Sequence, residues 1–120
     1  MPISYALLFP NRATRSEERF DFLAHPTLTF AEPDRVKYPA LDIAYDCMRR
    51  GGTAACVMNG SNEVAVAAFL QHQCRFTDIT ASIEYALERA TFVANPTLAD
   101  YEASNEESRA LAAEYLKLNK

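Results

Sequence analysis

The spacing of apolar residues changes near residue 37 of the chain. From Tyr38 onward, apolar side chains recur every three or four residues, which is the period of an amphipathic helix. The pattern predicts a helix from Pro39 to Arg50, closed by the glycine pair that follows it. Further helices are predicted over residues 53–58, 61–72, 77–94 and 97–118. Joined by short loops, they indicate a mainly α fold with a four-helix bundle over residues 38–120.

The breaks between these helices are inferred from polar residues. Asn59-Gly60-Ser61 is expected to form a turn, with Asn59 or Ser61 capping the next helix. Thr77 is the expected cap of the following helix, and Thr97 with Asp100 resembles a capping box. Asp46 and Arg50 lie at pairing distance on the first helix.

Each predicted helix has an apolar face that is expected to point inward. The run from Val64 to Leu70 is apolar on all sides, so that helix is expected to be buried on all sides. The other inward faces are predicted as Leu41, Ala44, Tyr45 and Met48; Ile79, Ile83, Ala86, Leu87 and Ala90; and Leu98, Tyr101, Ser108, Leu111, Ala112 and Tyr115.

The first 37 residues form a different region, which holds four of the six prolines. The apolar segment Pro2–Phe9 fits either a short helix or a strand. Residues 20–23 and 28–30 carry alternating apolar side chains, which favours short extended segments. Residues 1–37 are therefore predicted to be an extended, partly β linker arm. Its five aromatic residues suit contact with another domain or a second copy better than a small-molecule pocket.

Composition indicates a folded, cytoplasmic protein. The chain has 120 residues, 49% of them hydrophobic and 23% charged, which suits one domain with a core. The formal net charge of -4 and the lack of a basic cluster argue against nucleic acid as a partner. No apolar run reaches the ~20 residues needed to cross a bilayer. The start lacks the basic region of a secretory signal, and the three cysteines are read as reduced thiols.

The glycine count excludes standard nucleotide-binding loops. The three glycines are Gly51, Gly52 and Gly60, and neither a dinucleotide fingerprint nor a phosphate loop can be written with them. No cofactor-binding residue is therefore assigned in this chain.

Three groups of residues are candidates for a chemical role: the cysteines with the histidines, two acidic pairs, and a polar cluster. His72 and Cys74 could bind a metal together with His25, Cys47 or Cys56, but the paired spacing of zinc ligands is missing. A Cys–His nucleophile pair stays open on the sequence. The acidic pairs Glu17–Glu18 and Glu106–Glu107 lie in polar surroundings and are interpreted as solvated surface.

The densest polar cluster beside an apolar run is Asn59, Asn62 and Glu63. One interpretation is a ligand site or a catalytic carboxylate. The other is turn and capping chemistry, with the asparagine side chains bonding free amides at helix ends. The second interpretation is favoured.

The central stretch resembles the C-terminal region of the 1-deoxy-D-xylulose 5-phosphate reductoisomerases. The residues concerned are Gly51–Ala55 and Met58–Leu70, which match the family pattern N-A-A-N-E-x-x-V-x-A-F-L. The family continues with R-F-T-D-I, which stands here as Arg75–Ile79. Pro2–Ile3, Leu28–Asp34 and Tyr38–Pro39 also match in order and spacing. Gly60–Ser61 is a departure, because the family has two alanines there.

The resemblance implies a C-terminal piece of an enzyme. The family converts 1-deoxy-D-xylulose 5-phosphate to 2-C-methyl-D-erythritol 4-phosphate in non-mevalonate isoprenoid synthesis, with NADPH and a divalent metal (Mg or Mn). Its catalytic, cofactor and metal residues lie upstream of the matching region, so no catalytic or metal residue is assigned here. The resemblance implies that residues 1–37 are the end of the catalytic domain and the linker. It assigns structural roles to Asn59, Asn62, Glu63, Phe76, Thr77 and Asp78.

The chain is accordingly expected to be inactive alone and to brace the catalytic domain. Its expected partners are the remaining domains of the same polypeptide, with self-association through the apolar arm in their absence. The competing hypothesis is a free-standing helical interaction module that has lost the enzyme. An independent hydrolase is a third, remote reading.

Overall fold

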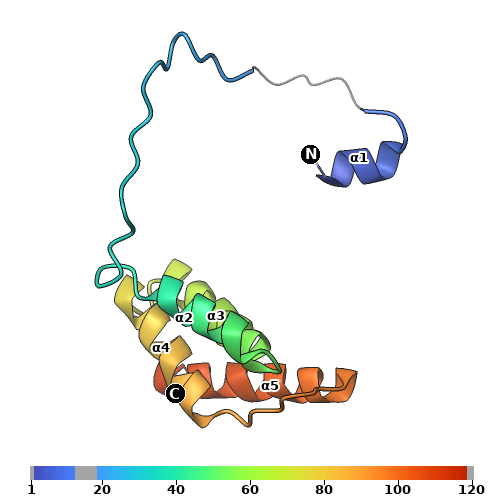
Figure 1. Ribbon diagram of the computed structural model, residues 1–120. Helices are drawn as coiled ribbons and strands as arrows, with labels where there is room; N and C mark the ends of the chain where they lie inside the picture. Colours follow the sequence, from blue (N-terminus) through green and yellow to red (C-terminus); the bar gives the residue numbers. More distant parts are fainter. Residues whose placement is uncertain (1, 13–18, 119–120) are drawn as a thin grey trace. The chain divides into compact units, whose positions relative to one another are not determined.

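The computed structural model describes residues 2–12 and 19–118 (Figure 1). It contains five helices within those residues: α1 (Pro2–Leu8), α2 (Ala40–Arg50), α3 (Ala54–Leu70), α4 (Phe76–Arg89) and α5 (Leu98–Tyr115). The chain divides into two compact units, Met1–Glu32 and Pro33–Lys120. The predicted mainly α fold is confirmed.

The first unit holds α1 and a tight turn around Asp21. The Asp21 carboxylate accepts hydrogen bonds from the backbone amides of Leu23 and Ala24, at 2.8 and 3.2 Å. No strand occurs among the described residues of this unit, so the predicted partly β arm is not supported. The alternating apolar residues 20–23 are bent by the Asp21 turn, and an isolated short strand has no partner that would complete a ladder. The segment Pro2–Phe9, which the sequence left open between helix and strand, forms the helix α1.

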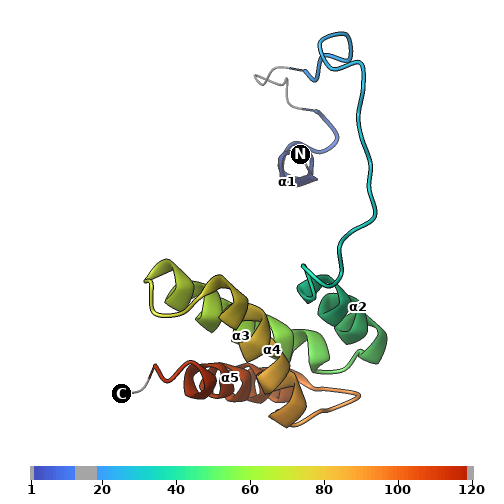
Figure 2. The ribbon, with the colours of Figure 1, turned by 90° about the vertical axis from the view of Figure 1, so that its left-hand side faces the viewer.

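The second unit is built around α3 (Figure 2). This helix packs against α5, α4 and α2, and α4 also packs against α5. The side chains at these contacts are small, because the fully buried positions are mostly alanine and serine. They include Ala54, Ser61, Ala65, Ala68, Ser82, Ala86, Ser104, Ser108 and Ala112. Small side chains allow helix axes to approach closely.

The helix α3 runs without interruption through residues 59–61, where a turn was predicted. That prediction was wrong for a physical reason. The Ser61 hydroxyl donates to the carbonyls of Val57 and Met58 within the helix, at 2.8 and 3.1 Å, instead of capping a new one. Gly60 is needed for space: a Cβ there would overlap the Ser108 hydroxyl and lie 3.0 Å from Asn105 Oδ1.

The expected burial of α3 on all sides was also wrong. Ala55, Asn59, Glu63, Ala67 and Leu70 are exposed and form one stripe along the helix. Leu70 has 70% of its surface exposed. Three neighbouring helices contact α3, and this stripe is the side that they leave open.

The helix ends follow local chemistry. Gly51 has φ 65° and closes α2 as predicted. The α4 helix begins at Phe76, with Arg75 at the cap position, so Thr77 is not the cap as predicted. At α5 the predicted capping box is confirmed: the Asp100 amide donates to Thr97 Oγ1 at 3.3 Å, and the Thr97 amide donates to Asp100 Oδ2 at 2.8 Å. That helix ends at Tyr115, before the predicted Leu118.

The inward faces were predicted correctly for α4 and only partly for α2 and α5. Ile83 and Ala86 are buried in α4. In α2 the buried residue is Cys47, whereas Tyr45 and Met48 are exposed. In α5, Ser108 and Ala112 are buried, but Leu98, Tyr101 and Tyr115 are exposed. The helical spacing was predicted correctly. In α2, however, Tyr45 and Met48 were expected to face the core, whereas the core side of the helix holds Cys47.

The loop after α4 is held by Thr53, a buried residue just before α3. The Thr53 amide donates to the Val93 carbonyl at 3.0 Å, and the Val93 amide donates to Thr53 Oγ1 at 3.1 Å. These two bonds satisfy polar groups that burial would otherwise leave unpaired. They join the beginning of α3 to the connection between α4 and α5.

In the described part of the chain, no helix combines the length and hydropathy required to cross a bilayer.

Candidate functional site

The polar cluster predicted around Asn59 and Glu63 lies along the exposed edge between α3 and α5. Asn59 and Glu63 are one turn apart on α3, and the Asn59 amide donates to Glu63 Oε1 at 2.9 Å. Asn105 and Arg109 are one turn apart on α5, and Arg109 Nε donates to Asn105 Oδ1 at 3.2 Å. An ion pair between Arg109 and Glu63 joins the two helices.

This arrangement keeps the Glu63 carboxylate ionised. Hydrogen bonds from Arg109 and Asn59 hold the pKa of Glu63 below its ordinary value. A general acid at neutral pH requires the opposite shift, in which burial raises the pKa of the carboxyl group. The geometry therefore supports a polar clasp across the α3–α5 contact.

The clasp lies next to a tight contact between the two helices. Gly60, beside Asn59, faces the buried Ser108, whose hydroxyl donates to the Asn105 carbonyl at 2.9 Å. The capping roles expected for Asn59 and Asn62 are wrong, because both residues lie inside a continuous helix. Asn62 instead borders a small cavity of about 230 Å³ beside α2, with Ile43, Ala44, Met58 and Ile83.

Sequence reasoning missed Arg109, which completes the clasp of Asn59, Glu63 and Arg109, and Asn105, which accepts a hydrogen bond from Arg109. Arg109 is 46 residues from Glu63 in the chain, and no local signal pairs them. The only available hint was the spacing of Asn105 and Arg109, which places both side chains on one face of a helix.

The second motif, Arg75–Ile79, forms the start of α4. Asp78 accepts the backbone amide of Arg75 at 2.8 Å, and the Arg75 guanidinium lies 2.9 Å from Asp78 Oδ1. The hydrogen bonds from Arg75 lower the pKa of Asp78. Phe76 packs edge-to-face against Phe69, with 5.7 Å between the ring centroids. Thr77 lies in the exposed first turn. The motif thus fixes the corner between α3 and α4.

The cysteines and histidines proposed as alternatives are dispersed. No group of three or more potential metal ligands occurs among residues 2–12 and 19–118. Burial raises the pKa of the Cys47 thiol, and desolvation also raises that of Cys74. Reactive thiols need a lowered pKa, so the two shifts oppose nucleophilic chemistry. Cys74 contacts the Ala65 carbonyl at 3.7 Å.

The acidic pairs differ from each other. Glu17–Glu18 lies outside the described residues. Glu106 is exposed as predicted. Glu107, however, is half-buried and accepts the Thr91 amide at 3.0 Å and the Thr91 hydroxyl at 3.2 Å, so it belongs to the connection between α4 and α5.

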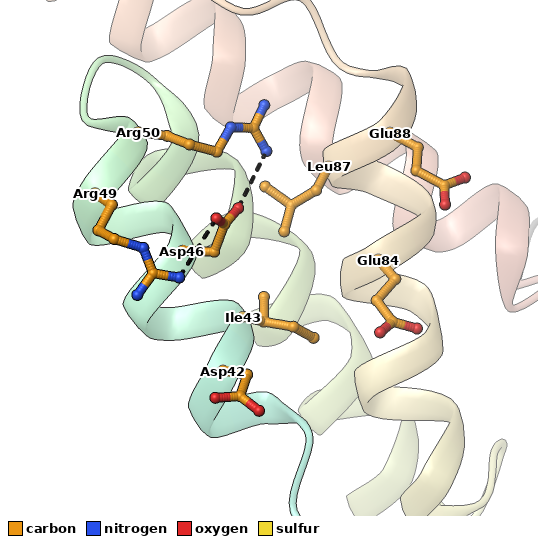
Figure 3. Close-up of a pocket in the computed structure, with 8 residues that line it drawn as sticks. All are labelled: Asp42, Ile43, Asp46, Arg49, Arg50, Glu84, Leu87 and Glu88. Carbon is orange, nitrogen blue, oxygen red and sulfur yellow. Dashed lines mark ion pairs between the residues drawn. The ribbon is translucent and has the colours of Figure 1, made fainter. Parts of the chain in front are cut away.

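A groove of about 810 Å³ runs between α2 and α4 (Figure 3). Ile43 and Leu87 face one another across it, and charged side chains form its rim. Asp46 pairs with Arg49 at 3.6 Å and with Arg50 at 4.0 Å, which confirms the predicted Asp46–Arg50 pair. Asp42 pairs with Arg35, and Glu88 with Arg89 at 3.0 Å. Asp42, Asp46 and Glu88 therefore have cationic partners, whereas Glu84, also on the rim, forms no ion pair with the described residues.

Comparison with known proteins gives a consistent result. Residues 1–111 match the model of the DXP reductoisomerase C-terminal domain. The 1-deoxy-D-xylulose 5-phosphate reductoisomerase of Bacteroides thetaiotaomicron is 43% identical over 116 residues, which are 97% of this chain and 30% of that protein. The enzyme of Ralstonia pickettii is 38% identical over 115 residues, or 96% of this chain and 29% of that protein.

Solved structures agree. The reductoisomerase from Zymomonas mobilis in complex with NADPH is similar with a TM-score of 0.82 and 35% identity, over 97% of this chain and 31% of that one. A DOX-P reductoisomerase in complex with NADPH, fosmidomycin and magnesium has a TM-score of 0.84 and 27% identity, over 98% of this chain and 31% of that one. The chain spans about a third of the length of these relatives.

Proposed function

The chain belongs to the DXP reductoisomerase C-terminal domain family, and from this premise we propose that it is the linker and C-terminal domain of a reductoisomerase polypeptide. In that polypeptide it supports the catalytic domain, while the rest of the protein carries out NADPH-dependent rearrangement and reduction of 1-deoxy-D-xylulose 5-phosphate. We further propose that the chain alone is inactive.

One observation carries this proposal: almost all of the chain matches less than a third of each relative. The match covers 97% of the chain but 30% of the Bacteroides thetaiotaomicron protein. A complete enzyme would match its relatives over most of their length. For a helical bundle that makes up about a third of an enzyme, structural support is the simplest role.

The chain's own residues do not fit the cofactor or the metal. Solved relatives are complexes with NADPH and with magnesium. The three glycines here cannot form a dinucleotide loop, and the described residues provide no cluster of metal ligands. We therefore place both sites in the part of the polypeptide outside this chain.

The proposed division of labour follows the sequence. Residues 1–37 would be the end of the catalytic domain and the linker, and residues 38–120 the bundle. Apolar side chains of the first unit are not covered within that unit; Leu23 and Phe30 are 91% and 90% exposed. Such residues suit contact with a catalytic domain, and they would favour self-association without one. We propose a cytoplasmic location for the whole enzyme.

The polar residues of the two family motifs, together with Arg109, would act in this support. The clasp of Asn59, Glu63 and Arg109 joins α3 to α5, and the Arg75–Asp78 pair orders the start of α4. We propose that they stabilise the shape of the bundle and take no part in the chemical step.

The reading frame upstream of the Met1 codon tests the proposal first. We expect an open frame that encodes a strand-turn-helix glycine motif and an acidic metal cluster. A stop codon close upstream would favour the alternative, a free-standing helical interaction module.

An activity measurement separates support from catalysis. We expect the purified chain to consume no NADPH when 1-deoxy-D-xylulose 5-phosphate and Mg²⁺ are supplied. The matched control is the Bacteroides thetaiotaomicron enzyme under the same conditions. Turnover by the chain alone would contradict the proposed inactivity.

A further inference from the structure

The α2 helix carries an apolar stripe that the bundle leaves uncovered. Leu41, Tyr45 and Met48 lie at positions i, i+4 and i+7, and Tyr38 extends the row by one turn. Tyr38, which precedes α2, is 53% exposed, Tyr45 43% and Met48 69%, whereas Leu41 is half-buried. We name these four residues the α2 stripe.

The stripe lies beside the face that holds α2 to the bundle. Cys47, the buried residue of α2, points toward the core, with Ile43 and Ala44 half-buried next to it. In the described part of the second unit, α3 is the main packing neighbour of α2. A helix with this regular apolar spacing normally covers it against another element.

We propose that the α2 stripe is the docking surface for the catalytic part of the reductoisomerase polypeptide. This inference rests on the proposed function and gives it a location on the bundle. The proposed occupant is the portion of the polypeptide that this chain does not span. In the Bacteroides thetaiotaomicron relative, the matched region covers 30% of the protein, so most of that protein lies outside it.

Chain connectivity favours this occupant over a second copy. The second unit begins at Pro33 and leads directly into α2. Asp34 orders this connection by accepting the amides of Val36 and Lys37 at 3.1 and 2.9 Å. The catalytic part would belong to the same polypeptide, so its contact with α2 would be intramolecular, with an effective concentration that reaches about millimolar for a short linker.

The start of the second unit also shapes one edge of the stripe. Arg35 forms an ion pair with Asp42, and its guanidinium lies 5.9 Å from the centre of the Tyr45 ring. The polar edge next to Tyr45 is therefore occupied by Arg35. An apolar partner would contact the opposite side of the ring together with Met48.

A second exposed apolar pair provides a matched control. Leu70 and Phe76 at the corner between α3 and α4 are 70% and 68% exposed, close to the value for Met48. They lie on two different helices, so they do not form a stripe along one helix. We expect this pair to stay accessible in the full polypeptide.

Hydroxyl-radical labelling followed by mass spectrometry tests the inference. The chain alone is compared with a full-length chimera in which it replaces the matched region of the Bacteroides thetaiotaomicron enzyme. We expect labelling of Tyr45 and Met48 to fall about fivefold or more in the chimera, because the centre of an interface excludes water. Labelling of Leu70 and Phe76 should stay the same.

The outcomes are distinguishable. Equal labelling of the stripe in an active chimera would overturn this inference and leave the proposed function standing. Weak labelling of Tyr45 and Met48 in the chain alone would also overturn it. If the labelling falls further as the protein concentration rises, a second copy covers the stripe. If it does not depend on concentration, residues 1–32 cover it. Stripe protection in a chimera without activity would support the docking surface and count against the proposed function.

A pair of variants provides an independent measurement. We expect Tyr45→Gln with Met48→Gln to lower the Tm of the chimera by several degrees and to leave that of the chain alone nearly unchanged. Leu70→Gln with Phe76→Gln is the control and should affect both proteins equally. Equal effects of the stripe pair on both proteins would contradict docking through α2.

Discussion

The α3–α5 contact and the α2 helix represent two ways of holding a helix in this bundle. The α3–α5 contact is built from small buried residues and closed by the clasp of Asn59, Glu63 and Arg109. The α2 helix buries one cysteine against the core and leaves its largest apolar side chains exposed. The contact between α3 and α5 is closed by residues of the chain itself, whereas α2 leaves Tyr45 and Met48 exposed.

This difference indicates which contacts determine the stability of the chain alone. Close packing makes the α3–α5 contact sensitive to any added volume. An exposed stripe tolerates polar substitution in isolation and becomes sensitive only when a partner covers it. The stability of the chain alone should therefore depend much more on α3 and α5 than on the outer face of α2.

The largest effect is expected at Gly60. A valine there would force its side chain into Ser108 and Asn105, and such overpacking costs up to about 3 kcal/mol. We expect Gly60→Val to lower the free energy of unfolding by about this amount, measured by urea denaturation followed by circular dichroism.

A double-mutant cycle tests whether the contact with Ser108 causes this loss of stability. Gly60→Ala alone should destabilise less, because alanine returns about 1 kcal/mol of helix propensity. Combining it with Ser108→Ala removes the overlapping hydroxyl and should restore most of the loss. If the two changes are simply additive, the Gly60–Ser108 contact does not limit the approach of the helices.

A smaller effect is expected on α2, where two adjacent residues differ in burial. Cys47 is 1% exposed and Met48 69%. Cys47→Ser places a hydroxyl in the core and should cost about 1 to 2 kcal/mol. Met48→Gln keeps a straight side chain of similar helix propensity and should change stability by less than about 0.5 kcal/mol.

Thermal unfolding of the chain alone measures both α2 variants. If Met48→Gln is as destabilising as Cys47→Ser, the outer face of α2 is covered within the chain, and the contrast with the α3–α5 contact disappears.

Local rules predicted the parts of the fold that depend on neighbours in the sequence. Gly51 at the end of α2 and the Thr97–Asp100 capping box need no tertiary information, and both were predicted correctly. The Asn59-Gly60-Ser61 segment reads as a turn by the same rules, yet it lies inside α3, where the glycine leaves room for Ser108 and Asn105 of α5. Such a contact between distant segments cannot be derived from local propensity.

The candidate site shows the same limit. Asn59 and Glu63 were identified from sequence as part of a polar cluster beside an apolar run, but Asn59 was assigned to capping and Glu63 to the first turn of a new helix, whereas both lie inside α3. Arg109, which gives Glu63 its partner, lies on a different helix. Leu41, Tyr45 and Met48 of the α2 stripe were predicted to face inward, because a helical period shows that a face is apolar but does not show which neighbour covers it.

The smallest expected effect is a dependence of the α3–α5 contact on acid. Because Arg109 and Asn59 lower the pKa of Glu63 in the folded chain, the carboxylate stabilises the fold above its unfolded pKa of about 4.3. That contribution is lost as pH falls through the lower, folded pKa. We expect Glu63→Gln to be less stable than the unmodified chain at pH 7, with the difference shrinking below about pH 4.

Urea denaturation at a series of pH values measures this difference, and Glu84→Gln on the exposed surface of α4 is the control. High salt should also reduce the Glu63 effect, because the pair with Arg109 is accessible to solvent. A difference between Glu63→Gln and the unmodified chain that stays constant with pH would mean that Glu63 contributes through packing. The α3–α5 contact would then owe its strength entirely to its small residues, and the contrast with α2 would rest on packing alone.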